Sequence, residues 1–438
     1  MNTVRSGLEY LGKLTPWNGR GGFALQYIRA VLRRLGDPQD ALPAIHIAGT
    51  NGKGSVSSGI SSILGAAGYR VGLNVSPHLQ VMNERIVVDG MPVSDDFLGE
   101  FAYAVRSAAA KELVELSFHE AITAIAFLGF RELGLEWMVI EVGLGGRLDA
   151  SNVITRPAAT SIVTIDYDHQ AILGSSLGEI AGEKAGIIKQ SVPMITGFLP
   201  PEAAMVVKKK ANGVPLYRFG EEYGARQTNG DSATTFGYWD KSFKAGVGDL
   251  LEYTPRLPGV HQGHNLAVAI KLGLTVGISP DVCKKGVEGV FWPARLERIE
   301  SSGREFILDC AHNTAGIRAF IEFAVSRGES NIDLVFGVLD TKNWQEMIQA
   351  LKPHVGTWRL LRPESERALP HSKLVSELAL SGSDIRVLDY GDDYEACLRD
   401  VFNKQDPYPT FVTGSMYMVG KLRSMLSVPS QPLWSIAR

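Results

Sequence analysis

The chain has 438 residues and a formal net charge of −3, with a pI near 6.3. The chain therefore lacks the excess of positive charge that binding to nucleic acid or to an anionic membrane surface would favour. Hydrophobic residues make up 45% and charged residues 21%, which is typical of a soluble globular protein. We therefore expect small-molecule substrates, no nucleic-acid or membrane partner, and two domains, because one core rarely organises so many residues.

The three cysteines, Cys283, Cys310 and Cys397, have no metal-like spacing. That pattern argues against a disulfide scaffold or a zinc site and favours a reducing compartment. The first residues, MNTVRSGLEYLGKL, lack the apolar core of a signal peptide, and no run approaches the length of a membrane span. We expect a cytoplasmic protein that is a monomer.

The first 43 residues predict a helix, a glycine-rich loop at Trp17–Gly22 and a second helix over about 23–35. Residues 45–62 then place an apolar strand, a glycine-rich turn and a helix start in succession. The glycines let the backbone N–H groups point inward, and the new helix presents the positive end of its dipole to an anion. Lys53 would reach the outer phosphates, and Ser55 would bind a bridging Mg²⁺. The predicted nucleotide-binding residues of this turn are Asn51, Gly52, Lys53, Gly54 and Ser55.

Strands and helices alternate after this turn. Asp89 and Gly90 predict a tight hairpin, and Ser94 is placed to cap a helix. A helix over 118–133 leads into the apolar strand WMVIEV, and the strand SIVTID follows. Continuous apolar strands between helices predict a doubly wound parallel sheet that is covered on both faces.

Residues from about 213 to 260 change to short aromatic and threonine-rich pieces, which predict a small antiparallel flap. Helices follow up to WPARLERI, which we interpret as closing the first domain near residue 295. The remaining chain repeats the strand and helix alternation over roughly 140 residues, within the size of one domain. The predicted architecture is thus α/β, with a phosphate-loop domain over 1–295 and a Rossmann-like C-terminal domain over 296–438.

Several motifs together carry a family resemblance. GTNGKGS has two residues where the common phosphate loop has four between its first glycine and its Gly-Lys pair. The other motifs are SPHL at 76–79, NERI at 83–86, EVGLGGRLDASN at 141–152, DHQAILG with GEKAGIIK up to 189, GHN at 263–265, WPARLE at 292–297, DCAHN at 309–313 and TGSMYMVG at 413–420. In this order they resemble the folylpolyglutamate synthase and dihydrofolate synthase branch of the Mur ligase superfamily, over nearly the whole chain.

The resemblance implies ATP and two Mg²⁺ ions at strand ends. One ion is held by Ser76, Glu141 and His169, and the other, on the phosphates, by Ser55 with Glu141. On the residues alone, Glu141 is a strand-end carboxylate that suits Mg²⁺ in a doubly wound sheet, or only a structural acid. His169 would by itself be read as a structural histidine.

The resemblance also implies roles for residues further along the chain. Asn265, Arg295 and Asp309 match positions that hold the base, ribose and phosphates of ATP, which would bind across the domain cleft. Arg295 has a surface salt bridge as its alternative, whereas an unpaired carboxylate at Asp309, after an apolar strand, would be costly. His312 and Ser415 match positions associated with the incoming amino acid, and His312 is also a catalytic candidate. His119 and Arg147 are assigned to the acyl substrate. The glycine-rich loop is either a connector or part of the acyl pocket, and in the second case Arg20 would bind a carboxylate.

Lys184 matches a lysine that in this family is carbamylated by CO₂ and then helps to bind Mg²⁺. The alternative from the sequence is a helix-face salt bridge to Glu183 or Glu179. Together with Lys53 and His312, Lys184 completes the predicted catalytic set.

The chain departs from the family pattern at four positions. His119 stands where phenylalanine is usual, Ala294 and Cys310 replace glycines, and Thr314 replaces a proline. Because His119 falls near the acyl pocket, the departures bear on the substrate more than on the reaction.

The implied reaction is ATP-dependent amide formation between L-glutamate and a folate or dihydropteroate carboxylate through an acyl phosphate. Two alternatives remain at this stage. One is a ligase of the same mechanism acting on another small carboxylate, and the other is a nucleotide-binding regulator without ligase activity.

Overall fold

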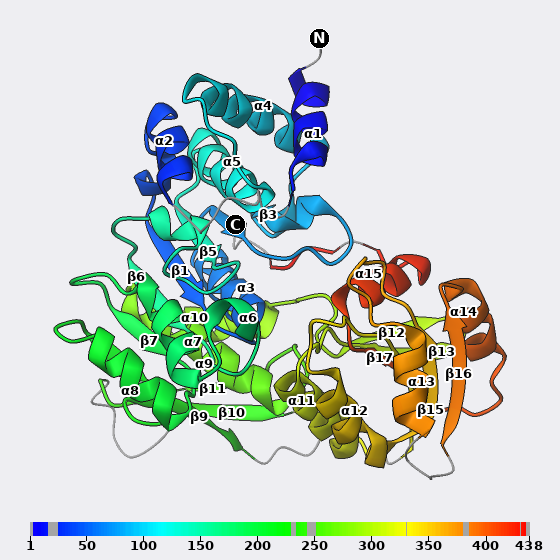
Figure 1. Ribbon diagram of the computed structural model, residues 1–438. Helices are drawn as coiled ribbons and strands as arrows, with labels where there is room; N and C mark the ends of the chain where they lie inside the picture. The colour runs from blue at the N-terminus through cyan, green and yellow to red at the C-terminus, as the bar shows by residue number, and fades with distance from the viewer. Residues whose placement is uncertain are drawn as a thin grey trace. The chain divides into compact units, whose positions relative to one another are not determined.

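The computed structural model describes residues 3–15, 25–228, 234–242, 251–329, 331–379, 385–429 and 431–434. The predicted glycine-rich loop at Trp17–Gly22, with Arg20, lies outside these residues. The chain forms two compact units, one comprising Met1–Arg256, Gln262–Phe291 and Gln431–Arg438, the other Leu257–His261 and Trp292–Ser430 (Figure 1). Within the described ranges, no helix combines the length and apolar character that crossing a membrane would need.

The first unit is built on an eight-stranded sheet in the order β4-β3-β2-β5-β1-β6-β7-β8. All pairs from β2 to β8 across this order are parallel, and β3 and β4 add an antiparallel edge. The strands are β1 (Ala44–Ala48), β2 (Val71–Asn74), β3 (Ile86–Val88), β4 (Met91–Pro92), β5 (Trp137–Glu141), β6 (Ala159–Ile162), β7 (Met194–Thr196) and β8 (Leu216–Arg218). The doubly wound parallel sheet predicted from the apolar strands is confirmed.

Helices cover this sheet. They are α1 (Thr3–Lys13), α2 (Gln26–Arg34), α3 (Lys53–Ala66), α4 (Asp95–Lys111), α5 (Phe118–Glu132), α6 (Gln170–Leu173), α7 (Leu177–Lys184), α8 (Pro201–Lys210), α9 (Val260–Thr275) and α10 (Pro280–Gly289). One buried cluster packs Ile28, Leu98 and Phe127 of α2, α4 and α5 against strand residues, and another packs α7 and α8. Helices α1, α2, α4 and α5 gather together in Figure 1. All five residues of β1 are buried, as expected for a central strand with both faces covered.

Local signals set several boundaries in this unit. Ser94 accepts a hydrogen bond from the N–H of Phe97 and caps α4, as predicted. Asp89 and Gly90, at φ 51° and 88°, turn β3 into β4, and the two strands pair antiparallel, as the predicted hairpin requires. Both features depend on neighbouring residues only.

The predicted flap is a three-stranded antiparallel sheet in the order β11-β10-β9. Its strands are β9 (Tyr223–Thr228), β10 (Thr235–Asp240) and β11 (Leu251–Tyr253). The prediction was wrong for residues 216–218, which form β8 and extend the large sheet parallel to β7. Strands of three residues have too little periodicity to reveal which sheet they join.

The second unit has one six-stranded sheet in the order β12-β13-β17-β14-β15-β16. Its strands are β12 (Glu297–Ser301), β13 (Arg304–Leu308), β14 (Ile332–Phe336), β15 (Val355–Leu361), β16 (Arg386–Gly391) and β17 (Thr410–Thr413), and its helices are α11 (Thr314–Ser326), α12 (Trp344–Leu351), α13 (His371–Ala379), α14 (Tyr394–Asn403) and α15 (Met416–Met425). β12 was not predicted as a strand. It pairs antiparallel with β13 through a turn in which Ser302 and Gly303 have positive φ. In the described part of the chain, the short 3₁₀ helices are Pro38–Asp40, Met82–Arg85, Ala150–Val153, Ala185–Ile187 and Lys352–His354.

The last strand, β17, inserts between β13 and β14 and is parallel to both. The order of the parallel strands therefore reverses at this point, and the loops that follow β13 and β17 meet at the carboxyl edge of the sheet. Ligands of doubly wound sheets bind at such a reversal.

Candidate active site

The predicted phosphate loop is the turn between β1 and α3. Gly52 caps α3 with φ 80°, and a Cβ there would lie 2.6 Å from Oδ1 of Asn265. The position therefore requires glycine, and it places Asn265 directly against the loop. The hydroxyl of Thr164 accepts the N–H of Asn51 and donates to its carbonyl, both at 2.9 Å. The loop is thus anchored to the chain segment that follows β6.

Two lysine amines converge on this loop. Nζ of Lys184 donates to the carbonyl of Gly49 at 2.9 Å, and Nζ of Lys53 donates to the same carbonyl at 3.2 Å. Lys53 also lies 3.9 Å from the Glu141 carboxylate. Burial, and then repulsion from the Lys53 ammonium, lower the pKa of Lys184 to about 7. The loop is therefore lined by donors and cations suited to a polyphosphate.

The salt-bridge interpretation of Lys184 is not what the structure contains. Glu183 instead pairs with Arg147, at 2.9 Å from its Nη2. Glu179 receives the backbone N–H groups of Ser175 and Ser176 and completes a capping box at the start of α7. Lys184 is left as a buried amine with a backbone acceptor.

Three oxygen-bearing side chains follow adjacent strands. Glu141 ends β5 and is 4% exposed. The hydroxyls of Ser55, at the start of α3 after β1, and Ser76, after β2, are buried and have no hydrogen-bond partner in the described part of the chain. Because β2, β5 and β1 are neighbours in the sheet, these side chains share its carboxyl edge. Carboxylate and hydroxyl oxygens are suitable ligands for Mg²⁺.

His169 lies in the segment after β6, which neighbours β1 in the sheet. Its backbone is left-handed at φ 52°, its side chain is about half exposed, and Nε2 lies 3.8 Å from the Asp168 carboxylate. Within the described residues no group of three or more His, Cys, Asp and Glu side chains is arranged to hold a metal. The predicted metal set differs from such a group because two of its four members are serines.

His119 belongs to a hydrogen-bonded network of side chains that the sequence did not reveal. Its Nε2 lies 3.2 Å from Oδ2 of Asp149, and Oδ1 of Asp149 accepts the hydroxyl of Ser151. Ser151 in turn bonds His46 at 2.8 Å. Burial opposes ionisation of Asp149, but the adjacent His119 and its hydrogen bonds hold the pKa of this carboxyl well below its usual range. Burial also lowers the pKa of His46 to about 3, so that ring is neutral at pH 7.

This hydrogen-bonded network also holds the loop after β5 in place. Oδ2 of Asp149 also accepts the N–H of Leu144 at 2.9 Å, and a Cβ on Gly143 would lie 2.6 Å from the His119 ring. His119 therefore packs against Gly143, which follows Glu141 by two residues in the chain. The other predicted acyl residue, Arg147, points to Glu183 and is about half exposed.

In the second unit, Asp309 follows β13 and is fully engaged by the backbone. Oδ1 accepts the N–H of Ala311 at 2.8 Å, and Oδ2 accepts that of Leu296 at 3.0 Å. These bonds answer the expectation that a buried carboxylate here needs a partner. They also hold the segment of Arg295, whose Nη1 donates to the carbonyl of Ala294.

His312 and Ser415 are brought together by the strand reversal. The N–H of Gly414 donates to the carbonyl of Ala311 at 3.0 Å, which joins the loops after β13 and β17. Nδ1 of His312 lies 2.8 Å from the carbonyl of Cys310. The Ser415 hydroxyl is buried, does not cap α15 and has no hydrogen-bond partner in the described ranges.

The sequence missed the supporting residues of the site rather than its centre. Thr164 was visible only as one residue of the strand SIVTID, and Asp149 only as part of a glycine-rich motif. A polar residue close to the carboxyl end of an apolar strand is the signal that could have identified Thr164.

Comparison with known proteins places the chain among related sequences. The family model described as the Mur ligase middle domain matches residues 47–273, and the one described as the Mur ligase glutamate ligase domain matches residues 294–407. A dihydrofolate synthase/folylpolyglutamate synthase of Bacillus subtilis (strain 168) is 32% identical over 414 residues, covering 91% of this chain and 94% of the relative.

Solved structures agree with these matches. The apo form of L. casei FPGS superposes with a TM-score of 0.84 at 30% identity, covering 98% of this chain and all of that chain. E. coli FolC in complex with DHPP and ADP superposes with a TM-score of 0.84 at 26% identity, covering 97% of each chain.

Proposed function

Because the chain belongs to the Mur ligase family, in its folylpolyglutamate and dihydrofolate synthase branch, we propose that it joins L-glutamate to a folate-type carboxylate. The acceptor is dihydropteroate or a folate, and ATP is the phosphate donor. The observation that carries the proposal is the convergence of Lys53 and Lys184 on one carbonyl of the phosphate loop, beside the buried carboxylate of Glu141.

The first step is transfer of the γ-phosphoryl group. An oxygen of the acyl carboxylate attacks the γ-phosphorus, the bond to the bridging oxygen of ADP breaks, and an acyl phosphate forms. The loop N–H groups and Lys53 stabilise the charge that shifts toward ADP. Asn265 lies against Gly52 of the loop, and we propose that its amide contacts the bound nucleotide.

The second step forms the amide. The amino nitrogen of L-glutamate attacks the acyl carbon, phosphate departs with the electrons of the carbon–oxygen bond, and the nitrogen loses a proton. A carbonyl can only accept, so the bond to Cys310 places a proton on Nδ1 of His312 and leaves Nε2 as the basic nitrogen of the neutral ring. We assign His312 as the proton acceptor, with Ser415 orienting the amino acid.

The strand-end residues fit Mg²⁺, and we propose two ions. Ser55, Ser76 and Glu141 supply oxygens, two of them hydroxyls that are buried without a partner, and His169 is the remaining ligand. When bound, the ions would neutralise phosphate charge during transfer. Glu141 meanwhile holds Lys53 toward the loop.

Residues of the second unit support the nucleotide in this proposal. Asp309 acts by fixing the segments of Arg295 and His312 through its two backbone bonds. Arg295 is the residue that would contact the nucleotide directly.

A second candidate is a ligase of the same mechanism with a different carboxylate substrate. The pairing of His119 with the buried Asp149 favours it, since an imidazole held by a carboxylate offers a polar surface where a flat pterin would be expected to meet an aromatic one. Arg147 would then act through Glu183 as a support of the loop rather than as a substrate ligand.

An ADP-release assay separates these functions. The protein is incubated with ATP and Mg²⁺ and a matrix of dihydropteroate, folate and simple aliphatic acids, each with and without L-glutamate. We expect release that requires both a folate-type acid and glutamate. Release with another acid would move the assignment to the second candidate, and equal turnover without any substrate would support a regulatory ATPase. The Lys53→Ala variant controls for contaminating ATPases.

We further propose that the enzyme works as a cytoplasmic monomer. Its three cysteines are buried and unpaired, which suits a reducing compartment. Size-exclusion chromatography with light scattering would test the oligomeric state.

A further inference from the structure

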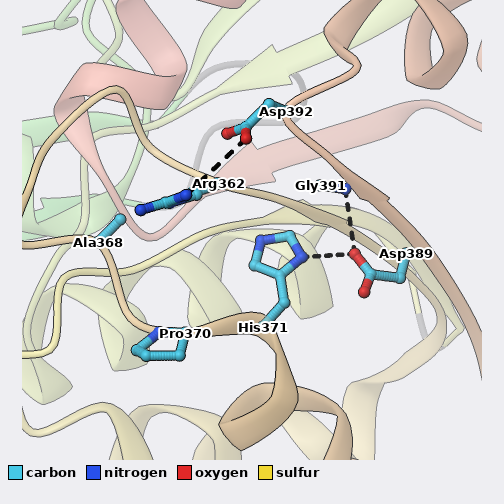
Figure 2. A pocket seen from close by; sticks show the side chains of 7 residues that line it. All are labelled: Arg362, Ala368, Pro370, His371, Asp389, Gly391 and Asp392. Carbon is cyan, nitrogen blue, oxygen red and sulfur yellow. Dashed lines mark hydrogen bonds and ion pairs between the residues drawn. The ribbon is translucent and has the colours of Figure 1, made fainter.

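A pocket of about 480 Å³ lies in the second unit, and none of the residues that line it belongs to the proposed active site (Figure 2). Arg362 follows the end of β15, and Gly391 ends β16, so the pocket opens at the carboxyl edge of two parallel strands. Pockets of ~300–1,000 Å³ are typical of small-molecule sites, and this edge is where doubly wound sheets hold ligands. The lining residues are Arg362, Ala368, Pro370, His371, Asp389, Gly391 and Asp392.

One side of the pocket is a fixed polar wall. Oδ1 of Asp389 bonds Nδ1 of His371 and also accepts the N–H of Gly391 at 3.1 Å. The carboxylate therefore orients the imidazole, which lies between Asp389 and Arg362 in Figure 2. Nε2 of His371 is buried without a hydrogen-bond partner among the described residues. Such an atom destabilises the folded state until a polar group reaches it.

The other side has two charges that can be redirected. Nη1 of Arg362 lies 3.9 Å from the Asp392 carboxylate, with half of the arginine side chain and most of the aspartate exposed. An ion pair this long and exposed contributes little, so a ligand can replace it. The backbone of Arg362 is meanwhile held, because its N–H donates to Gly391 and its carbonyl accepts the hydroxyl of Tyr394 at 2.7 Å.

The charges select the class of ligand. The lining holds one arginine and two aspartates, so it has no excess of positive charge that would favour a polyanion such as ATP. A guanidinium binds a carboxylate through two parallel hydrogen bonds, and an aspartate beside it suits an ammonium group. An α-amino acid carries both groups on one carbon.

We propose that this pocket binds a free α-amino acid, with its carboxylate on Arg362 and its ammonium on Asp392. The identification of that amino acid as L-glutamate rests on the proposed function. The site is distinct from the His312 and Ser415 loops, because β14 separates β15 and β16 from β13 and β17 in the sheet.

The test observes Arg362 directly. The full chain is labelled with ¹⁵N-arginine, and the side-chain signal of Arg362 is identified by its absence in Arg362→Gln. Without nucleotide, L-glutamate is expected to shift this signal saturably. Asp392→Asn should raise the dissociation constant for L-glutamate by about tenfold or more, since it removes the charged partner of the ammonium. Glu395→Gln is the matched control, because Glu395 pairs with Arg399 on the exposed face of α14, and it should change nothing.

Glutarate, which has both carboxylates of glutamate but no amine, provides the second arm. It should bind more weakly than L-glutamate, and Asp392→Asn should not weaken its binding, because glutarate has no ammonium for the aspartate to hold. An unshifted Arg362 signal at saturating L-glutamate would overturn the proposal, and so would equal binding of glutarate and glutamate. Glutamate-dependent ADP release by the unmodified protein tests the proposed function separately, so either conclusion can fail without the other.

Discussion

Lys184 should carry a proton that is lost near neutral pH. Its side chain is 4% exposed. Among the charged groups around it, the Lys53 ammonium has the largest effect on its pKa. Burial and that neighbour lower its pKa to about 7, from the ~10.4 of a lysine in water. Roughly half of the molecules would then have a neutral amine at pH 7, compared with about one in a few thousand for an unperturbed lysine.

The lowered pKa makes stability depend on pH in a defined direction. Between about pH 7 and 10 the unfolded chain holds the Lys184 proton and the folded chain does not, so the free energy of unfolding rises with pH. Below pH 7 both states are charged and the full cost of burying the ammonium is present. Lowering the pKa of Lys184 from 10.5 to about 7 corresponds to about 4–5 kcal/mol in the free energy of unfolding, as an upper bound.

The assay compares the unmodified protein with Lys184→Met, which keeps the length of the side chain without the charge. In ¹³C-lysine NMR, the signal missing from the variant identifies Lys184, and its titration should centre near pH 7. In urea unfolding at pH 6.5 and 9.5, the stability advantage of the variant should shrink by at least about 2 kcal/mol at the higher pH. The difference between the two proteins is compared at the two pH values, so the contributions of other titrating groups to the free energy of unfolding cancel in this double difference.

A midpoint near pH 10 for the Lys184 signal, together with a double difference below about 0.5 kcal/mol, would refute the reasoning. The neutral amine also explains how CO₂ could form a carbamate at this position, since only the unprotonated amine reacts. If carbamylation supplies a metal ligand, Lys184→Ala should be nearly inactive and partly rescued by a small added carboxylic acid. Turnover that is insensitive to CO₂ depletion would argue against the modification.

Further predictions concern four single substitutions. Lys53→Ala should lower turnover by about 10²–10³-fold with little loss of stability, because the amine stabilises charge in transfer and is not part of a core; steady-state kinetics at normal rates would remove the phosphate-loop assignment. Glu141→Ala should raise the Mg²⁺ concentration for half-maximal activity by about tenfold or more, and an unchanged titration would leave Glu141 a structural acid. Leu113→Gly should stabilise the protein by about 0.5–1 kcal/mol, because Leu113 follows α4 in the left-handed region at φ 55° and is 92% exposed. Gly134→Ala, at the equivalent position after α5 with φ 60°, should destabilise it by a similar amount in thermal unfolding, and the opposite signs would be absent if left-handed strain were unimportant.

The sequence alone predicted those features that neighbouring residues determine. The glycines of the phosphate loop, the Asp89–Gly90 turn and the Ser94 cap act within a few residues of themselves. Apolar runs likewise identified the central parallel strands, because a strand covered on both faces must be apolar on both. The family motifs then indicated which strand ends to join into one site.

The tertiary structure decided which distant segments meet. Lys184 reaches Gly49 across 135 positions in the chain, and the pairing of His119 with Asp149 depends on how α5 packs against the loop after β5. No local pattern records these contacts. The same holds for β8, which joins the large sheet although its sequence resembles the flap.

Local chemistry determines where a strand or turn forms, because backbone conformation and capping depend on adjacent side chains. The order of strands, the burial of an amine and the resulting pKa depend on packing between segments that are far apart in the chain. For this protein the sequence therefore determined the phosphate loop and the α/β class. Only the tertiary structure decided that Lys184 is a buried amine beside that loop, and that the segment after β15 forms a pocket of its own.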